Sequence, residues 1–312
     1  MLYVTTKSIN DVYTANRTLC ADFAPDGGLF IPYRMPFYTH KELYPIVENT
    51  FPQTVADILN VFFPVHLNGW DIEFAVGKVL KIQSLGQKIH VAELWHNPDL
   101  DFTFVFKKLF HAVSGRESDE PTQWFAIALR IAILFGIYGE LIREGALEKG
   151  QMMDVSVNAQ NSAETVAVFY AKQMGLPVGT VIFSCEEDSV IWEFFRRGSV
   201  STSALAEQVD SAQMLERIIY SVFSKEDSAH LREAVQSGGL YRIDAEAVIA
   251  MQKETFAAAV GTTRLDIVIN SVFHKDNYKM HAHTARSMGG LQDYRASAGE
   301  SRTAILFSEK AE

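Results

Sequence analysis

The stretch VSVNAQNSAETVAVFYAKQMGLP, residues 155–177, indicates the fold class. It reads as a strand that runs into a helix, and the helix ends at Gly175 before Pro177. At such a strand-to-helix turn, α/β proteins usually carry a glycine-rich loop whose backbone N–H groups hold a phosphate. The turn from Asn158 to Ser162 contains no glycine. The sequence therefore predicts the frame of a phosphate-binding turn without the residue that most easily closes on an anion.

The chain continues with the same alternation of strand and helix. A strand is predicted over residues 179–185, and a helix over residues 187–198 ends at Gly198. Strand, helix, strand and helix at this spacing indicate parallel βαβ pairing. Beyond them we expect mostly helices, including one helix over residues 244–261, and a last strand over residues 302–308 that rejoins the sheet. The predicted fold class is α/β.

The N-terminal third reads as mainly helical. The paired glycines at 27–28 make a turn before a short buried strand at 29–31. Apolar residues recur at helical spacing over residues 54–64 and again over residues 71–82, and a small strand is predicted over residues 88–95. This region is expected to fold around helices.

Residues 121–150 read as one long helix, with a proline at its start and a glycine at its end. Its middle is apolar nearly all round, as a membrane span would be. Arg130 interrupts it, and the uninterrupted apolar run over residues 131–138 is far shorter than the roughly 20 residues that a span needs. We expect a central core helix and no membrane.

The composition is that of an ordinary globular protein, since 48% of the 312 residues are hydrophobic and 21% are charged. The net charge is −10, and no block rich in lysine and arginine is available to neutralise a run of phosphates. Nucleic acid is therefore not an expected partner. The first residues show no basic end followed by an apolar run, so we expect no signal peptide and a cytoplasmic location.

The residues that usually bind metals are scattered. Cys20 and Cys185 lie far apart without CxxC spacing, which argues against a disulfide framework and against a zinc site. His281 and His283 are two apart in a predicted helix or loop, which does not make a ligand set. The acidic residues at 186–188 lie between a strand and a helix and are interpreted as helix caps. No metal site is expected.

Short motifs at both ends of the chain and in its middle follow the order of one enzyme family. They are MLYVTT at residues 1–6, APDGGLFIP at 24–32, AKQMGLPVGTVIFSCEEDSVIWEFFRRG at 171–198, DSAQMLERIIY at 210–220, HAHTA at 281–285 and AILFSEKAE at 304–312. Together they resemble the threonine synthase family, pyridoxal-phosphate (PLP) enzymes that convert phosphohomoserine to threonine. The resemblance implies PLP fold type II, like tryptophan synthase β. It also implies a threonine synthase-like N-terminal domain over residues 1–95 and a large α/β domain over residues 96–312.

The family's PLP-binding lysine lies in a segment that is similar to residues 94–112 here, LWHNPDLDFTFVFKKLFHA. His96 and Pro98 match the family, and Phe106 and Lys107 stand for its phenylalanine and lysine. The residues that follow the proline and the lysine differ, and extra residues lie between them. Lys107 is therefore the candidate Schiff-base lysine, with an ordinary exposed lysine of a helix or strand as the alternative.

In the family, a small βαβ domain follows this lysine, covers the cofactor and grips the substrate phosphate. Here only residues 109–123 separate Lys108 from Trp124, which resembles a tryptophan of the family. A βαβ unit needs about 30 residues. Most of the small substrate domain is therefore expected to be missing.

The family's phosphate-binding turn is GNFG, and Gln160, Asn161, Ser162 and Ala163 occupy the corresponding positions here. Replacing both glycines adds β-carbons where the backbone would approach the phosphate. Ser308 stands where the family has a threonine or serine that faces the pyridine nitrogen. By this resemblance, Gln160, Asn161, Ser162 and Ser308 are remnants of a cofactor site.

These losses predict a truncated and degenerate threonine synthase-like protein that binds no PLP and is retained as a binding or scaffolding protein. Loss of the small domain should expose apolar parts of the helix over residues 121–150 and the flank at residues 104–110. We therefore expect a homo-oligomer or a protein partner. The alternative is a residual PLP-dependent lyase that acts on phosphohomoserine or a related amino acid and uses Lys107.

Overall fold

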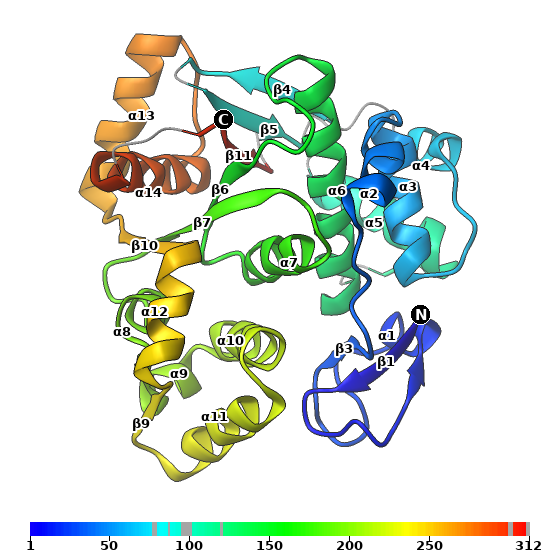
Figure 1. Ribbon diagram of the computed structural model, residues 1–312, viewed down its shortest axis with the longest axis vertical. Helices are drawn as coiled ribbons and strands as arrows, with labels where there is room; N and C mark the ends of the chain where they lie inside the picture. Colours follow the sequence, from blue (N-terminus) through cyan, green and yellow to red (C-terminus); the bar gives the residue numbers. More distant parts are fainter. Residues whose placement is uncertain (77–79, 87, 95–101, 119–120, 299–301, 310–312) are drawn as a thin grey trace.

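The structure is a computed structural model that describes residues 1–76, 80–86, 88–94, 102–118, 121–298 and 302–309. A six-stranded sheet in the order β10-β7-β6-β11-β5-β4 forms the body of the molecule (Figure 1). Its strands are β4 Lys81–Ser84, β5 Ile89–Glu93, β6 Met153–Asn158, β7 Val178–Cys185, β10 Thr255–Ala259 and β11 Ala304–Ser308. Every pair is parallel except β4 with β5. This is the parallel sheet that the βαβ spacing predicts.

Helices cover both faces of this sheet. One face carries α13 Thr262–Asp276 and α14 Ala282–Ala298, and the other carries α7 Ser162–Gln173 and α8 Val190–Arg197. Because side chains alternate along a strand, Ile305 packs into the core on the α7 side while Ala304 and Leu306 pack on the α14 side. The strands are thus buried on both faces, which explains their nearly unbroken apolar sequences.

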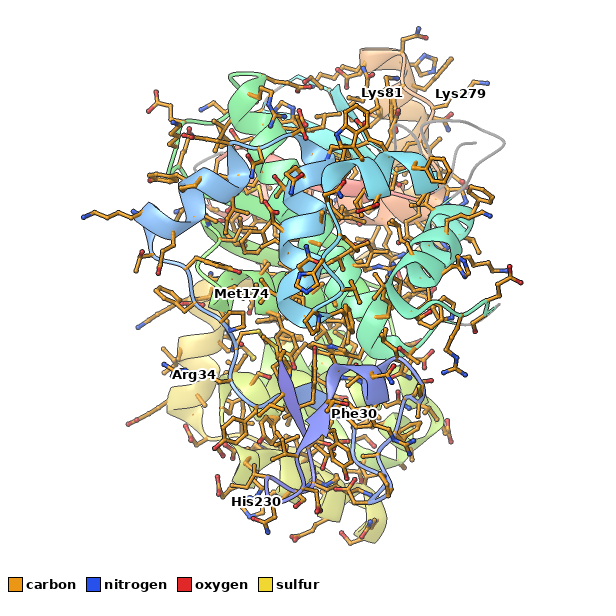
Figure 2. The ribbon with its side chains drawn as sticks, turned by 90° about the vertical axis from the view of Figure 1, so that its right-hand side faces the viewer. Phe30, Arg34, Lys81, Met174, His230 and Lys279 are labelled. Carbon is orange, nitrogen blue, oxygen red and sulfur yellow. The ribbon has the colours of Figure 1, made fainter. Side chains whose placement is uncertain are left out.

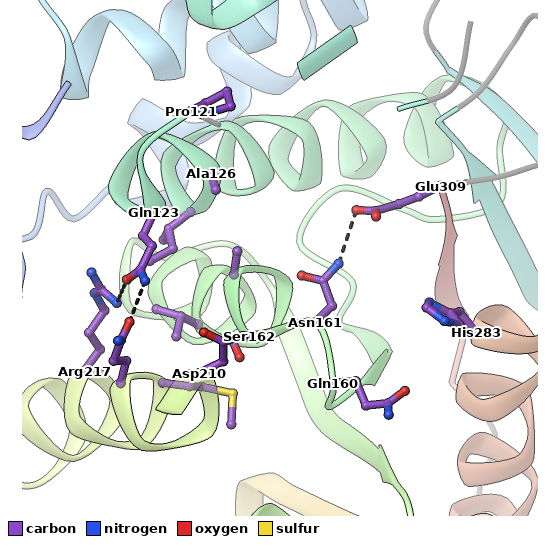
Figure 3. A pocket seen from close by; sticks show the side chains of 15 residues that line it. Pro121, Gln123, Ala126, Gln160, Asn161, Ser162, Asp210, Arg217, His283 and Glu309 are labelled. Carbon is purple, nitrogen blue, oxygen red and sulfur yellow. Dashed lines mark hydrogen bonds between the residues drawn. The ribbon is translucent and has the colours of Figure 1, made fainter. Parts of the chain in front are cut away.

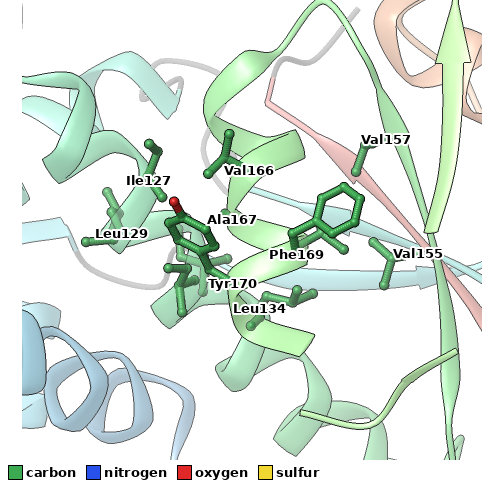
Figure 4. Close-up of a cluster of buried hydrophobic side chains, with 14 of the residues drawn as sticks. Ile127, Leu129, Leu134, Val155, Val157, Val166, Ala167, Phe169 and Tyr170 are labelled. Carbon is green, nitrogen blue, oxygen red and sulfur yellow. The ribbon is translucent and has the colours of Figure 1, made fainter. Parts of the chain in front are cut away.

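Helix α6, Gln123–Arg143, is the central helix of the larger core. It packs between α7 and α3 Phe51–Phe62, and Figure 4 shows Ile127 and Leu134 of α6 beside Val166 and Tyr170 of α7. Among the described residues it is the one helix long and apolar enough to cross a membrane, and 78% of its apolar window is buried inside the protein. The structure thus confirms the predicted core helix.

The expectation that α6 would be exposed is wrong. Helix α5, Phe102–Ser114, lies against it, and the rings of Phe106 and Phe110 are centred 5.4 and 5.1 Å from the ring of Phe125. The segment that carries Lys107 therefore covers α6.

The N-terminal region combines a small antiparallel sheet with short helices. Strand β1, Leu2–Thr5, lies between β2 Tyr13–Thr14 and β3 Phe30–Pro32, and the helices are α1 Ala15–Thr18, α2 His40–Val47, α3 and α4 Gly69–Val76. The hydroxyl of Tyr3 donates to the carbonyl of Phe62, so this sheet, with Phe30, lies at the C-terminal end of α3 (Figure 2).

The remaining elements form a helical lobe beside the sheet (Figure 1). They are β8 Ser199–Ser201, α9 Thr202–Glu207, α10 Val209–Val222, α11 Lys225–Ser237, β9 Leu240–Arg242 and α12 Ala245–Glu254. Strands β8 and β9 pair antiparallel, outside the main sheet.

Three predicted helices extend too far. The core helix expected over residues 121–150 ends at Arg143. The helix expected over residues 71–82 ends at Val76, and strand β4 begins at Lys81. The helix expected over residues 244–261 ends at Glu254, and the alanine-rich residues that follow form β10. Alanine favours helices, but pairing of β10 with β7 between α8 and α14 overrides that preference.

Gly139 of α6 sets how closely α2 can approach. A β-carbon there would overlap the carbonyl group of Val47 at the end of α2. On an exposed helix, Gly→Ala raises the free energy of unfolding by about 1 kcal/mol. Here we expect Gly139→Ala to lower it by about 1–3 kcal/mol, because the added methyl group overpacks a rigid contact. Urea unfolding measures this difference, and a more stable variant would contradict the contact.

Candidate functional site

The turn between β6 and α7 folds without a glycine because its own polar side chains close it. The side chain of Asn158 accepts a hydrogen bond from the backbone N–H of Gln160 at 3.2 Å, and the backbone N–H of Asn161 donates to the carbonyl of Asn158 at 2.9 Å. None of residues 158–162 has a positive φ angle. The conformation that favours glycine is therefore not used in this turn.

Asn161 caps the N-terminus of α7. Its side-chain oxygen accepts a hydrogen bond from the backbone N–H of Glu164 at 3.1 Å. Such N–H groups at the start of a helix have no partner within the helix and are the groups that usually bind anions. One of the donors that a phosphate could use is thus already taken by the protein.

The amide of the same side chain faces a carboxylate. Asn161 Nδ2 donates to Glu309 Oε1 at 3.2 Å (Figure 3). Arg130 Nη2 donates to the same oxygen at 2.6 Å. Glu309 directly follows β11, which pairs with β6 in the middle of the sheet. Since parallel strands end at the same edge, the end of β11 brings Glu309 to the turn after β6.

Arg130 reaches this point from the buried helix α6. Its side chain is 13% exposed, and its guanidinium carbon lies 5.7 Å from the centre of the Phe106 ring. A buried charge needs a partner of opposite charge. Glu309 is that partner, so we name Arg130, Asn161 and Glu309 the Arg130–Glu309 site.

The carboxyl group of Glu164 lies near Glu309 and Arg130. Glu164, in the first turn of α7, is buried, and this burial together with the nearby charge of Glu309 raises its pKa well above the ordinary value, while Arg130 lowers it. Two carboxyl groups thus share the field of one guanidinium, and Glu164 is driven toward its neutral form.

Two crevices flank the turn. The first, of about 410 Å³, lies between the starts of α6, α7 and α10, and Asn161, Arg217 and Glu309 line it (Figure 3). The second, of about 830 Å³, lies at the ends of β6 and β7 and is bordered by the carboxylates at residues 186–188 and by Arg286. Both open at the carboxyl ends of parallel strands, where α/β proteins usually bind ligands.

The structure brings together three of the residues singled out from the sequence. Gln160 and Ser162 line both crevices, and Asn161 lines the first. Lys107, half-buried on α5, lines neither. His96 and Pro98, which match the family's lysine segment, lie outside the described residues.

Ser308 is buried at the end of β11 and is not among the residues that line the two crevices. Its side chain lies against the hydroxyl of Tyr278, which also meets Glu93. Burial and the charge of Glu93 raise the pKa of Tyr278.

Sequence reasoning missed Arg130, Glu164 and Glu309 as parts of the site. One signal was available for Arg130, since a single arginine in an apolar helix requires an acidic partner elsewhere in the fold. Nothing in the sequence identifies that partner as Glu309, because the two residues are 179 positions apart. Only the sheet order brings them together.

The described residues do not fit the phosphate of PLP at this turn. A phosphate dianion beside Asn161 would lie against the negatively charged carboxylate of Glu309, and the carboxyl group of Glu164 is also nearby. Two like unit charges 4 Å apart near a protein surface repel by about 4 kcal/mol. Arg130 and the start of α7 would attract an anion at this turn, but Arg130 is already paired with Glu309.

The raised pKa of Glu164 makes the stability depend on pH. The folded protein holds this proton more tightly than the unfolded chain, whose ordinary pKa is 4.5. The stabilisation is complete below that value and is lost as the pH rises through the folded-state pKa, by on the order of 1 kcal/mol per pH unit at most. We expect Glu164→Gln to remove this loss, as measured by urea unfolding over a pH series. Glu187→Gln is the exposed control, and an equal effect of both variants would contradict the assignment.

Comparisons with known proteins give related sequences and related folds. The family model described as "Threonine synthase N terminus" matches residues 2–77. "Threonine synthase-like 1" of Homo sapiens is 22% identical over 197 residues, which are 60% of this chain and 26% of that protein. "Threonine synthase" of Methylobacillus glycogenes is 26% identical over 133 residues, 39% of this chain and 27% of that protein. The alignments thus span about a quarter of the length of these relatives.

Solved structures share the fold over the whole chain. Threonine synthase from yeast has a TM-score of 0.78 at 15% identity and covers 99% of this chain and 87% of its own. PLP-bound threonine synthase from Brucella melitensis has a TM-score of 0.77 at 16% identity and covers 100% of this chain and 89% of its own. The match of the N-terminal family model and the similarity to the curated relatives support membership in the threonine synthase family, and the solved structures show that the chain has the threonine synthase fold.

Proposed function

We propose that this protein is a truncated and degenerate threonine synthase-like protein of the cytoplasm that binds or scaffolds without PLP and without catalysis. The observation that carries the proposal is the Arg130–Glu309 site, where the chain's own carboxylate meets the helix start that would hold the cofactor's phosphate. Asn161 further satisfies one N–H group of that helix start.

The position of Lys107 supports the same proposal. A lysine that bonds covalently to a cofactor must direct its amine into the cofactor's cleft, with its pKa lowered by the surroundings. Lys107 lies on α5, outside the lining of both crevices at the turn. Helix α5 instead contributes Phe106 and Phe110 to the cover of α6.

A binding role is supported by the crevices that remain. Both open at the carboxyl ends of the parallel strands, and the second is wide and bordered by exposed carboxylates. A fold that keeps such openings without a cofactor can still hold a small ligand or a segment of a partner.

The loss of PLP binding can be tested by absorbance. After addition of PLP we expect no visible-range band of a lysine-bound cofactor, because neither the phosphate site nor the lysine position suits it. Wild type, Lys107→Ala and the neighbouring control Lys108→Ala should give the same spectrum. A band that is present in wild type and in Lys108→Ala but absent from Lys107→Ala would instead establish the residual lyase as the better reading.

Self-association is the second part of the proposal, and an aromatic pair on α4 supports it. Trp70 and Phe74 are 80% and 96% exposed and lie four residues apart on one face of this helix. Large exposed apolar side chains are typical of association surfaces. We propose that a second copy of the chain covers them.

We expect wild type to be a dimer or larger by light scattering at micromolar concentration, and Trp70→Ser with Phe74→Ser to shift it toward the monomer. Ile249→Ser with Ile267→Ser, on exposed positions of α12 and α13, is the matched control. A monodisperse wild-type monomer would refute self-association.

A further inference from the structure

We propose that Glu309 is an intramolecular ligand of an anion site, and that its carboxylate keeps inorganic phosphate and similar small oxyanions out of that site. This inference deepens the proposed function. It rests on that function because it requires that no cofactor takes the place of Glu309. It predicts that the chain retains the elements of an anion site and blocks them itself.

The geometry around Glu309 is that of a bound anion. One carboxylate oxygen accepts two hydrogen bonds, from Arg130 Nη2 at 2.6 Å and from Asn161 Nδ2 at 3.2 Å. Figure 3 shows the donor from the turn before α7, Asn161, and the acceptor, Glu309, which follows β11. The second donor, Arg130, comes from α6. Three segments that are far apart in the sequence thus converge on a single negative charge.

The surroundings favour negative charge at this point. The first turn of the 12-residue helix α7 carries the partial positive charge of the helix dipole, and Arg130 adds a full charge in a partly buried position. The guanidinium of Arg130 also donates a hydrogen bond to the backbone carbonyl of Ala126 and lies against the ring of Phe106. These two contacts hold it in place. The positive side of the site therefore exists independently of Glu309.

The pairing of β11 in the sheet positions Glu309 at the site. Strand β11 pairs with both β5 and β6, and the carbonyl of Ser308 accepts a hydrogen bond from the N–H of Leu94 at 2.8 Å. The backbone that leads to Glu309 is thus fixed up to the preceding residue. A tethered group has an effective concentration in the millimolar range or above, so free phosphate well below that concentration does not displace it.

The neighbouring acid limits how much negative charge the site accepts. Burial and Glu309 together raise the pKa of Glu164, which indicates that the site already disfavours a second anion. A phosphate added beside Glu309 would be a third acidic group around one arginine. Removing the charge of Glu309 should therefore open the site to phosphate and lower the pKa of Glu164.

The experiment measures binding of inorganic phosphate to the full chain by isothermal titration calorimetry. Glu309→Gln keeps the size of the side chain and removes its charge, and we expect it to bind phosphate at least about tenfold more tightly than wild type. Glu233→Gln changes the net charge equally at an exposed carboxylate of α11, away from both crevices, and should behave as wild type. Adding Arg130→Gln to Glu309→Gln should abolish the gained binding.

A second measurement does not depend on phosphate. The pKa of Glu164, followed by carbon NMR of its carboxyl group, should fall in Glu309→Gln and stay unchanged in Glu233→Gln. If Glu309→Gln does not fold, Glu309→Asp serves in its place, because the shorter side chain withdraws the carboxylate while it keeps the charge. It should bind phosphate more tightly than wild type, though less tightly than a neutral variant would.

The inference is overturned if the Glu309 variant binds phosphate no more tightly than Glu233→Gln, or if wild type binds it equally well. These outcomes leave the proposed function in place, because phosphate has no aldehyde and reports nothing about Lys107. A lysine-bound PLP band in wild type would overturn the proposed function by itself.

Discussion

The charge of Arg130 constrains the rest of the structure. It stands on a helix whose other described residues are mostly buried in apolar packing, so it must find an acidic partner inside the fold. That partner, Glu309, is available only if β11 lies next to β6 and the turn after β6 opens toward α6. The ion pair therefore joins α6, β11 and the turn after β6. It lies at the turn where the resemblance to threonine synthases places the remnant of a cofactor site.

The turn after β6 shows how a strand-to-helix connection can fold without a glycine. With glycine, such a turn brings backbone N–H groups close to an anion at no steric cost. Asn158 and Asn161 close the same connection with side-chain hydrogen bonds and ordinary negative φ angles. The side chain of Asn161 accepts from one N–H group of the helix start, and Glu309 in turn accepts from the amide of Asn161.

Local patterns were sufficient to predict the parallel sheet, α7 and the burial of α6. Each depends on the spacing of apolar residues and on glycine or proline at an element's end, as at Gly175 and Pro177. Strand β10 was missed because its alanines carry no strand preference, and only the space beside β7 makes them a strand. The Arg130–Glu309 site was missed for a related reason, since no local pattern encodes a contact that is set by the order of strands.

A short helix covers the apolar side of α6. An apolar helix left open to water would have to be buried by another chain or would favour aggregation. Here the short segment before Trp124 forms α5 and places Phe106 and Phe110 on Phe125. Phe106 also lies under Arg130, so the helix that covers the core also holds the positive charge of the site. The covering of α6 and the positioning of Arg130 are therefore two effects of one packing arrangement, because Phe106 of α5 takes part in both.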